Sequence, residues 1–238
     1  MKKLAIIITS TILVLFVSVY LVNELSKVRT FQLFGGLVTS VETNEKVVAL
    51  TFDDGPGANT QAILDVLRNH EVKGTFYLTG HELETYFIEG VNIVEEGHEI
   101  GNHSFSHQRM IFKTPAFVKD EIEKTDELIR KIGYEGVITF RPPFGRRLVV
   151  LPHYLSKNDR NTILWNIEPE SYPDVAADST KIVEYVVDNI EPGSIILLHV
   201  MYESRTESLQ SVEGIITSLK EQGYAFKTVS ELLEYSNQ

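Results

Sequence analysis

The sequence has 238 residues, of which 43% are hydrophobic and 23% charged, with 15 Gly, 8 Pro and no Cys. Enough apolar material is present for one sizeable core, which excludes a disordered tail and a disulfide-stapled mini-protein, and the missing Cys excludes thiol catalysis and thiolate zinc sites. Residues 1–30 carry a net charge of +3 within a total of −11, so the remainder carries −14. That acidic balance excludes nucleic acid as a partner, because such binding needs clustered Lys and Arg.

The first predicted element is a membrane-spanning helix. Leu4–Val22 runs for 19 residues without a charge, behind Lys2 and Lys3, and as a helix it spans roughly 30 Å of hydrocarbon. The basic pair predicts a cytoplasmic tip at residues 1–3, a single-pass signal anchor at 4–22 and an extracytoplasmic remainder. The alternative is a cleaved secretory signal and a secreted protein. It is disfavoured because Ser18 is the one small residue near the end of the run, and large residues lie two positions to either side.

The remaining chain is predicted to form a stalk over residues 23–44 and one folded domain over 45–238. Seven short, mostly apolar runs are the strand candidates: Val47–Phe52, Gly74–Leu78, His98–Asn102, Val137–Phe140, Thr162–Ile167, Ser194–Leu198 and Ala225–Thr228. Amphipathic helix candidates lie between them: Asn59–Asn69, Thr114–Ile132, Ser179–Asn189 and Glu207–Glu221. These patterns predict helices laid on a sheet.

Alternating strands and helices predict parallel strands joined by helical crossovers. A (β/α) barrel and an open doubly wound sheet both satisfy this pattern. About 195 residues are available for the domain, whereas a complete eight-fold barrel typically needs about 250, so a barrel would be reduced or distorted. In both architectures ligands bind at the C-terminal ends of the strands, which makes polar residues at those ends the candidates for function.

Two pairs of polar residues follow the first and third predicted strands. Asp53 and Asp54 are adjacent, and such a pair is useful where one carboxylate binds a metal ion and the other accepts a proton, although Asp-Gly-Pro is also good turn chemistry. His103 and His107 are four residues apart and can grip one metal ion, although two unrelated surface histidines would look the same. One aspartate and both histidines would form a metal site with positions open for water and substrate.

Three further strand ends carry candidate residues. Arg141 precedes two prolines and could hold a carboxylate in a bidentate pair, with a structural salt bridge as the alternative. Trp165 and Tyr172 could form the floor of a sugar site, although a single Trp in an apolar run is more often part of the core. His199 ends the sixth predicted strand and is either a core histidine or a general acid.

The motifs in this order resemble those of the polysaccharide deacetylases, the NodB-like carbohydrate esterases. The family motifs Thr-Phe-Asp-Asp-Gly-Pro, His-Ser/Thr-x-x-His, Arg-x-Pro-Tyr and Leu-x-His have counterparts at Thr51–Pro56, His103–His107, Arg141–Phe144 and Leu197–His199. The resemblance covers about residues 45–232. It implies an α/β fold, a distorted (β/α) barrel with about seven parallel strands, here preceded by one N-terminal transmembrane helix.

The resemblance also implies roles for individual residues. The implied ligands of a divalent metal ion, typically zinc, are Asp54, His103 and His107. The implied catalytic residues are Asp53 as general base, Arg141 to orient it, and His199 as general acid. The residues expected to contact the substrate are Pro143, Phe144, Trp165 and Tyr172, with the backbone amide of Phe144 holding the oxyanion.

Two positions depart from the family pattern. Phe144 replaces the usual Tyr, a mild change if only the backbone amide is used. The family's Asp-Trp pair corresponds to Ser171 and Tyr172, and Ser171 cannot supply the charge that keeps the acid histidine protonated in the family. Three acidic residues could substitute, namely Glu168, Glu170 and Asp174. Without a known substitute we expect His199 to be less readily protonated and the enzyme to be slow.

The expected function is metal-dependent hydrolysis of N-acetyl groups from a cell-wall glycan, foremost the N-acetylglucosamine of peptidoglycan, with release of acetate. The expected partners are the N-acetylated glycan and the membrane. One alternative is a glycan-binding wall protein that has lost turnover through the altered fourth motif. Another is an O-acetyl esterase on the same fold.

Overall fold

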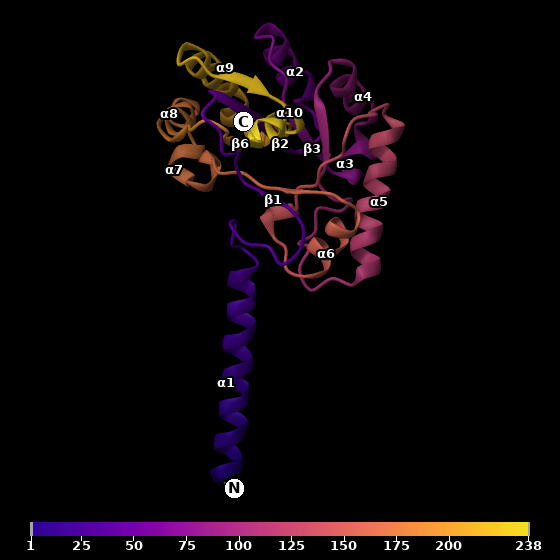
Figure 1. The fold of residues 1–238 in the computed structure, drawn as a ribbon, viewed down its shortest axis with the longest axis vertical. Coiled ribbons are helices and arrows are strands. Elements are labelled where there is room, and N and C mark those ends of the chain that lie inside the picture. Colours follow the sequence, from indigo (N-terminus) through magenta and orange to yellow (C-terminus); the bar gives the residue numbers. More distant parts are fainter. Residues whose placement is uncertain (1, 238) are drawn as a thin grey trace.

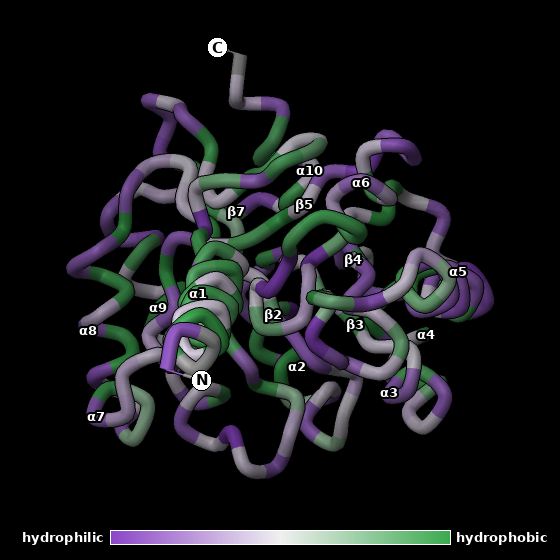
Figure 2. Tube along the Cα trace, turned by 90° about the horizontal axis from the view of Figure 1, so that it is seen from below, coloured by the Kyte–Doolittle hydropathy of each residue, from purple (hydrophilic) through white to green (hydrophobic). Residues whose placement is uncertain are grey.

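Two parts of different shape make up the computed structural model, which describes residues 2–237. Helix α1 (Lys2–Leu25) extends away from the domain formed by the rest of the chain (Figure 1). Every side chain from Ile6 to Leu21 is exposed, and Figure 2, a view from below, shows the predominantly apolar helix projecting from the domain. Residues Ile6–Leu25 are long and apolar enough to cross a membrane. A signal sequence meets the same criterion.

The central strand of the domain is β2 (Val47–Gly55), which pairs in parallel with three others. The strand order is β4 (Glu99–Asn102), β3 (Thr75–Leu78), β2 and β6 (Ile195–Leu198), and β7 (Ala225–Lys227) pairs with the start of β2. A separate parallel pair joins β1 (Leu37–Val38) to β5 (Thr162–Ile163). Every ladder between strands in the described residues is therefore parallel, as the sequence pattern predicts, and one isolated antiparallel bridge joins Ser40 to Ser194.

Single bridges close these strands into a ring. Phe140 bridges Asn102 at the end of β4 and Thr162 at the start of β5, and Ile167 bridges Ile196 in β6. Two stretches of the wall thus consist of isolated bridges rather than ladders, so the sheet is an incomplete, distorted (β/α) barrel. Its strand ends meet on one side of the molecule, where the polar side chains of the motifs follow.

Helices form the outer layer around this barrel, as Figure 1 shows. They are α2 (Thr60–Asn69), α3 (Gly80–Thr85), α4 (Phe87–Glu95), α5 (Pro115–Lys131), α6 (Val150–Lys157), α7 (Pro173–Ala176), α8 (Ser179–Asn189), α9 (Thr206–Glu221) and α10 (Val229–Leu233). Short 3-10 turns lie at Pro143–Gly145, Pro169–Ser171, Glu203–Arg205 and Glu234–Asn237. Neighbouring helices pack on one another in the sequence α8, α9, α2, α4, α3, α5 and α6.

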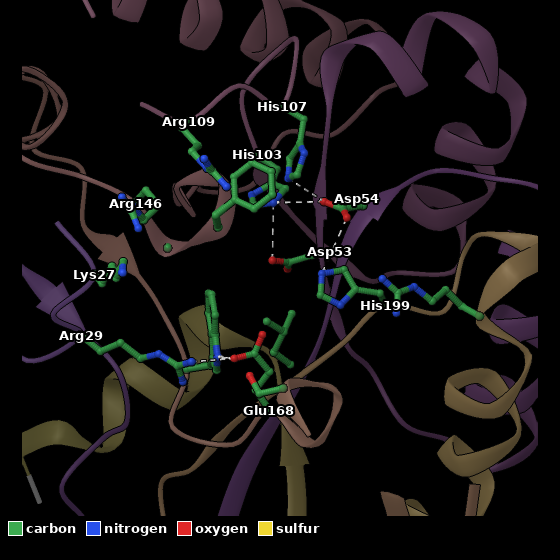
Figure 3. A pocket seen from close by; sticks show the side chains of 16 residues that line it. Lys27, Arg29, Asp53, Asp54, His103, His107, Arg109, Arg146, Glu168 and His199 are labelled. Carbon is green, nitrogen blue, oxygen red and sulfur yellow. Dashed lines mark hydrogen bonds and ion pairs between the residues drawn. The ribbon is translucent and has the colours of Figure 1, made fainter. Parts of the chain in front are cut away.

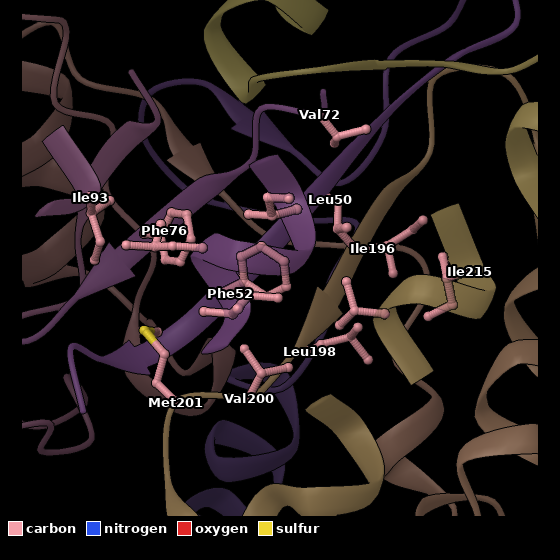
Figure 4. Close-up of a cluster of buried hydrophobic side chains, with 14 of the residues drawn as sticks. Leu50, Phe52, Val72, Phe76, Ile93, Ile196, Leu198, Val200, Met201 and Ile215 are labelled. Carbon is pink, nitrogen blue, oxygen red and sulfur yellow. The ribbon is translucent and has the colours of Figure 1, made fainter. Parts of the chain in front are cut away.

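The side chains of β2 alternate between two cores, because successive residues of a strand point to opposite faces. Leu50 and Phe52 face the outer helices, where Phe52 meets Phe76 with ring centroids 4.9 Å apart (Figure 4). Val47 and Ala49 face the barrel interior, with Trp165 and Leu197 in the same cluster. Asp53 continues the inward-facing series and is thereby directed into the barrel mouth.

The expected element boundaries hold within about one residue for the long amphipathic helices and for the short strands β3, β4, β6 and β7, and they fail at two of the predicted strands and at the stalk. Val137–Phe140 is not a strand, since Phe140 alone bridges its neighbours and Val137 is exposed. Thr162–Ile167 is a strand only at Thr162–Ile163, with one further bridge at Ile167. The expected stalk at 23–44 contains β1, so its second half is part of the folded domain. A two-residue strand has too little periodicity to register in a sequence pattern.

Substitution of two isoleucines of α4 tests how much the packing of this outer helix contributes to the free energy of unfolding. Ile93 is fully buried and Ile88 is 65% exposed on the same helix. We expect Ile93→Ala to lower the free energy of unfolding by about 2–5 kcal/mol, because buried methyl groups and their contacts are lost. Ile88→Ala should change it by less than about 0.5 kcal/mol. Urea unfolding of both variants measures the difference, and equal losses would contradict the assignment of α4 to the core.

Candidate functional site

A bulge at the end of β2 brings two adjacent carboxylates into one site. Asp53 pairs with Tyr77 of β3 and Gly55 pairs with Leu78, so that Asp54 is an extra residue without a partner across the ladder. Asp54 has a φ of 72°, in the left-handed region. On a regular strand, neighbouring side chains point to opposite faces. The bulge instead directs both Asp53 and Asp54 toward the same two imidazoles.

The loop after β4 carries those imidazoles and is braced from behind. Glu121 of α5 accepts hydrogen bonds from the backbone N–H groups of Phe105 and Ser106 and from the Ser106 hydroxyl. The side chain of Asn102 accepts a bond from the Ser104 N–H. These contacts hold a non-helical loop whose end residues are His103 and His107.

Three side chains converge on a position suited to a metal ion. Oδ1 of Asp54 lies 3.3 Å from Nε2 of His103 and 3.0 Å from Nε2 of His107 (Figure 3). These donor atoms all lie within 4.8 Å of one another. Two imidazole nitrogens and one carboxylate oxygen form a ligand set that zinc and other divalent transition ions accept, with positions left for water and substrate.

The hydrogen bonding at His103 supports the same interpretation. Nδ1 of His103 lies 2.7 Å from the carbonyl oxygen of Arg141, which can only accept, so Nδ1 carries the proton. In the neutral imidazole, Nε2 then presents a lone pair to Asp54. Oδ1 of Asp54 is buried and has no hydrogen-bond partner within the described residues 2–237. A buried oxygen facing a nitrogen lone pair is the arrangement that a shared cation stabilises.

The charge state of Asp54 suits a ligand. Burial opposes ionisation of Asp54, but hydrogen bonds from His103 and His107 when these are protonated, with the positive charges of His103 and His199, hold the pKa of this carboxyl well below its usual value. With neutral imidazoles, a bound cation would supply the positive charge instead. Asp54 is therefore ionised at neutral pH.

Backbone strain is concentrated around these ligands. Asp54, Ser104, His107 and Phe144 all have φ between 53° and 72°, which is unfavourable for residues other than glycine. Such conformations cost of order 1–3 kcal/mol each and persist where the surrounding structure enforces them. Here the bulge and the braced loop are that surrounding structure.

Asp53 is held by a buried ion pair behind the ligands. Nη1 of Arg141 lies 2.6 Å from Oδ1 of Asp53 and donates to the Thr51 hydroxyl at 2.8 Å. Its Nη2 donates to the carbonyl of Leu164, and the guanidinium stacks over the Tyr77 ring at 4.0 Å. Arg141 is fully buried and does not line the pocket, so its role is to position Asp53.

His199 has an acidic partner, and it is Glu170, one of the three possible substitutes that the sequence left open. Glu170 accepts hydrogen bonds from both Nδ1 and the backbone N–H of His199, and Ser208 donates to the same carboxylate. Burial alone lowers the pKa of His199, but the hydrogen bond and charge of Glu170, with smaller contributions from Asp54 and Asp53, raise it to about 9. The expectation that His199 is less readily protonated was therefore wrong. Glu170 supplies the charge that Ser171 cannot.

The pocket at the strand ends has a volume of about 480 Å³ and collects some of the predicted substrate contacts. Phe144 and Trp165 line it, together with Asp53, Asp54, both ligand histidines and His199. Trp165 is also part of the interior core, which confirms that interpretation, while its contact with a sugar stays a prediction. Pro143 is buried outside the lining, and Tyr172 packs against Tyr185 with ring centroids 5.1 Å apart. Neither of these two lines the pocket.

A group of basic residues at the pocket was missed by the sequence analysis. Five cationic side chains line it: Lys27, Arg29, Arg109, Arg146 and Arg205. The first two belong to the segment expected to be a stalk. Arg109 follows β4, Arg146 follows the bridge residue Phe140, and Arg205 lies in the 3-10 turn after β6. A weak signal was present, because Arg109 and Arg146 each come two residues after a motif residue. Spacing alone could not show that the five meet.

The partnership between Glu170 and His199 is tested by Glu170→Gln, which keeps the shape and removes the charge. We expect the pKa of His199 to fall from about 9 toward its ordinary 6.5, because the hydrogen bond and charge of Glu170 are lost while Asp54 and Asp53 still oppose the effect of burial. NMR titration of the imidazole measures this value. Since a raised pKa stabilises the fold below pH 6.5 and that stabilisation is lost as pH rises through 9, the wild type should exceed the variant in stability at pH 6 by up to about 3 kcal/mol. The difference should disappear above pH 10.

Glu168→Gln is the matched control. Glu168 accepts a hydrogen bond from the Trp165 indole at 2.8 Å and pairs with Arg29, without contact to His199. Its neutralisation should leave the pKa of His199 near 9. If both variants lowered the pKa of His199 equally, the overall negative charge around the pocket, rather than the contact with Glu170, would set the protonation of His199.

Comparison with known proteins is consistent across sequence and structure. A family model described as polysaccharide deacetylase matches residues 40–161. A peptidoglycan-N-acetylglucosamine deacetylase of Bacillus cereus is 34% identical over 208 residues, which cover 85% of this chain and 95% of that protein. The peptidoglycan-N-acetylmuramic acid deacetylase PdaC of Bacillus subtilis is 34% identical over 201 residues, and the chain spans only 41% of its length.

Among solved structures, the Bc1960 peptidoglycan N-acetylglucosamine deacetylase superposes with a TM-score of 0.77 at 32% sequence identity, covering 84% of this chain and 94% of that one. The chain belongs to the polysaccharide deacetylase family and has its distorted (β/α) barrel fold.

Proposed function

We propose that this protein is a metal-dependent hydrolase that removes N-acetyl groups from a cell-wall glycan, foremost peptidoglycan, and releases acetate. The observation that carries the proposal is the convergence of the ligands Asp54, His103 and His107 beside Asp53 and a protonated His199 in one pocket. The deacetylase names of its relatives support the same reaction.

The chain supplies a base next to the ligand site. A divalent ion bound by the three ligands supplies Lewis-acid polarisation of the acetyl carbonyl and lowers the pKa of a water molecule. Asp53 lies 3.6 Å from Nε2 of His103, close enough to the ligand site to take a proton from the attacking water. Arg141 occupies Oδ1 of Asp53 and leaves Oδ2, the oxygen that faces the ligand site, to act as the base.

The remaining groups stabilise charge and release the amine. The backbone N–H of Phe144 has no carbonyl acceptor in the described structure, so it is free to donate to the tetrahedral oxyanion. His199, as imidazolium, donates its Nε2 proton to the departing nitrogen. The carbon–nitrogen bond then breaks, giving acetate and a free amino sugar.

The protonated state of His199 bears on the two alternatives. An amide nitrogen leaves a tetrahedral intermediate only after it is protonated, whereas an alkoxide is a better leaving group. A firmly held proton donor therefore favours N-acetyl over O-acetyl substrates. The Glu170 contact also removes the reason to expect lost turnover, which was the motive for the glycan-binding alternative.

Acetate release tests the proposed reaction. With a divalent metal present, the protein should release acetate from peptidoglycan or N-acetylglucosamine oligomers and bind about one ion per chain. Asp54→Asn or His103→Ala should reduce kcat/KM by at least about 100-fold, because each removes a ligand. Asp65→Asn, a change to an exposed aspartate of α2, should leave activity unchanged. Faster release from acetylated xylan than from N-acetylated sugars would favour the esterase instead.

We also propose that α1 is retained as a membrane anchor. Its side chains from Ile6 to Leu21 contribute nothing to the domain core, and the segment after it is fixed to the domain. Arg147, which is buried, donates to the carbonyls of Val28 and Phe31, and its backbone N–H donates to the carbonyl of Ser26. The anchored enzyme would hold its pocket close to the membrane surface, because Lys27 lines that pocket only two residues beyond the end of α1.

Fractionation and mass measurement test the anchor. The chain should remain in the membrane after carbonate washing and should keep the mass of its N-terminal helix, because about 20 apolar residues hold a span in the bilayer. A soluble product shortened by the length of the helix would establish a cleaved signal instead. A variant beginning after Leu25 serves as the soluble control.

A further inference from the structure

One side of the pocket carries an unusual concentration of positive charge. Lys27, Arg29, Arg109 and Arg146 lie along this side, facing Asp53, Asp54 and His199 across the pocket in Figure 3. Arg205 lines the same pocket from the loop after β6. We call these five residues the basic rim. The portion of the chain beyond residue 30 has a net charge of −14, so the rim is a local reversal of the domain's charge.

The rim carries more positive charge than its neighbours balance. Lys27 pairs with Glu24, and Arg29 pairs with Glu168 at 2.6 Å. Arg109, Arg146 and Arg205 form no ion pair within residues 2–237. A guanidinium is charged at every pH at which the protein is folded, so these three charges persist.

Arg109 and Arg146 are held in place without an anion. The Arg109 guanidinium lies 5.2 Å from the centroid of the Phe144 ring, over the loop that supplies the oxyanion-binding N–H. Arg146 donates to the Asn23 side chain, while its Nε is buried and has no hydrogen-bond partner among the described residues. Burial and the charge of Arg109 lower the pKa of Arg146, with Glu24 opposing. A bound anion would relieve this repulsion between the two guanidinium groups.

The segment that follows α1 is part of this arrangement. Ser26 is buried, and the Arg147 side chain bonds to the carbonyls of Val28 and Phe31 and to the side chain of Gln32. Arg29 then reaches the pocket floor, where its guanidinium lies 4.8 Å from the Trp165 ring centroid. Residues outside the family's barrel motifs therefore form one wall of the pocket.

We propose that the basic rim is a subsite for an anionic group, a carboxylate or a phosphate carried by the glycan near the N-acetyl group that reacts. The enzyme then acts on acidic N-acetylated glycans in preference to neutral ones. This inference rests on the proposed deacetylation. A pocket of about 480 Å³ that contains both the ligand site and the rim places the anion within about one or two sugar units of the acetyl group.

The first experiment compares substrates that differ in charge. The full-length protein, in detergent with its metal, is assayed for acetate release from four glycans: neutral N-acetylglucosamine oligomers, the same oligomers carrying a 6-phosphate, peptide-free peptidoglycan strands with free carboxylates, and those strands with the carboxylates converted to methylamides. We expect the carboxylate strands or the phosphorylated oligomers to exceed their neutral counterparts by about tenfold or more in kcat/KM. A higher kcat/KM in the carboxylate pair identifies a carboxylate as the anion, and a higher kcat/KM in the phosphate pair identifies a phosphate. Equal kcat/KM for charged and neutral partners in both pairs overturns the proposal.

Variants of the rim give the second comparison. Arg109→Gln, a change to an exposed side chain, and Arg109→Gln with Arg146→Gln should raise KM for the preferred acidic glycan by about threefold and about tenfold. The ratio of kcat/KM for the acidic glycan to kcat/KM for neutral oligomers should fall in both variants, and the wild-type preference should weaken as salt is added. Lys124→Gln with Lys131→Gln on the exposed face of α5 is the matched control and should change neither. Equal losses on acidic and neutral glycans overturn the proposal.

A binding measurement separates failure of the subsite from failure of the proposed reaction. Trp165 is the only Trp in the chain and lies in the pocket, so its fluorescence reports occupancy. If no glycan releases acetate, the deacetylase proposal fails. The rim is still decided by titration with acidic and neutral glycans: tighter binding of the acidic glycan that the double variant abolishes supports the subsite. Equal binding of both glycans overturns it.

Discussion

The buried guanidinium of Arg141 is the contact on which the rest of the site depends. It bonds to Thr51 and Asp53 on β2 and to the carbonyl of Leu164 beyond β5, and its own carbonyl accepts the Nδ1 proton of His103. One residue thus joins two sides of an incompletely hydrogen-bonded barrel, orients the base and fixes the tautomer of a ligand. A buried charge of this kind is tolerated because Asp53 is its counter-ion and Thr51 and Leu164 accept further hydrogen bonds, although its Nε has no partner among the described residues. Loss of the Asp53 charge would leave an uncompensated ion in a medium of low dielectric constant.

The proton on His199 is stabilised in the same way, by a buried carboxylate, which here belongs to Glu170. In the family pattern the charge beside the acid histidine comes from an Asp, whereas here Glu170 reaches His199 from the 3-10 turn after β5. The longer side chain compensates for its position one residue earlier in the chain. Ser208 of α9 and the backbone N–H of His199 fill the remaining acceptor sites of the carboxylate. The negative charge beside His199 is therefore retained, although the Asp-Trp motif that supplies it in the family pattern is absent from this sequence.

Charge is arranged on two scales in this molecule. The domain as a whole is acidic, which discourages association with other polyanions, while the pocket mouth is basic. The positive potential of these basic residues is concentrated at the opening of the cleft, because the surrounding protein has a low dielectric constant. An anionic ligand is therefore favoured to approach there. Because the segment after α1 contributes Lys27 and Arg29, the same residues that lead out of the apolar helix also shape what the pocket accepts.

The sequence by itself determined the parallel α/β class, the apolar N-terminal helix, the long helices and the motif residues at the strand ends that the fold brings together. These follow from local information, namely periodicity in runs such as Thr114–Ile132 and ordered motifs at strand ends. Only the tertiary structure decided that Val137–Phe140 closes the barrel by one bridge, that Leu37–Val38 belongs to the sheet, and that Glu170 rather than Glu168 or Asp174 meets His199. It also brought together five basic residues from four separate segments. The physical reason is that pairing across a barrel, burial and electrostatic contact depend on distances in space, and residues far apart in a chain carry no periodic signal of where they meet.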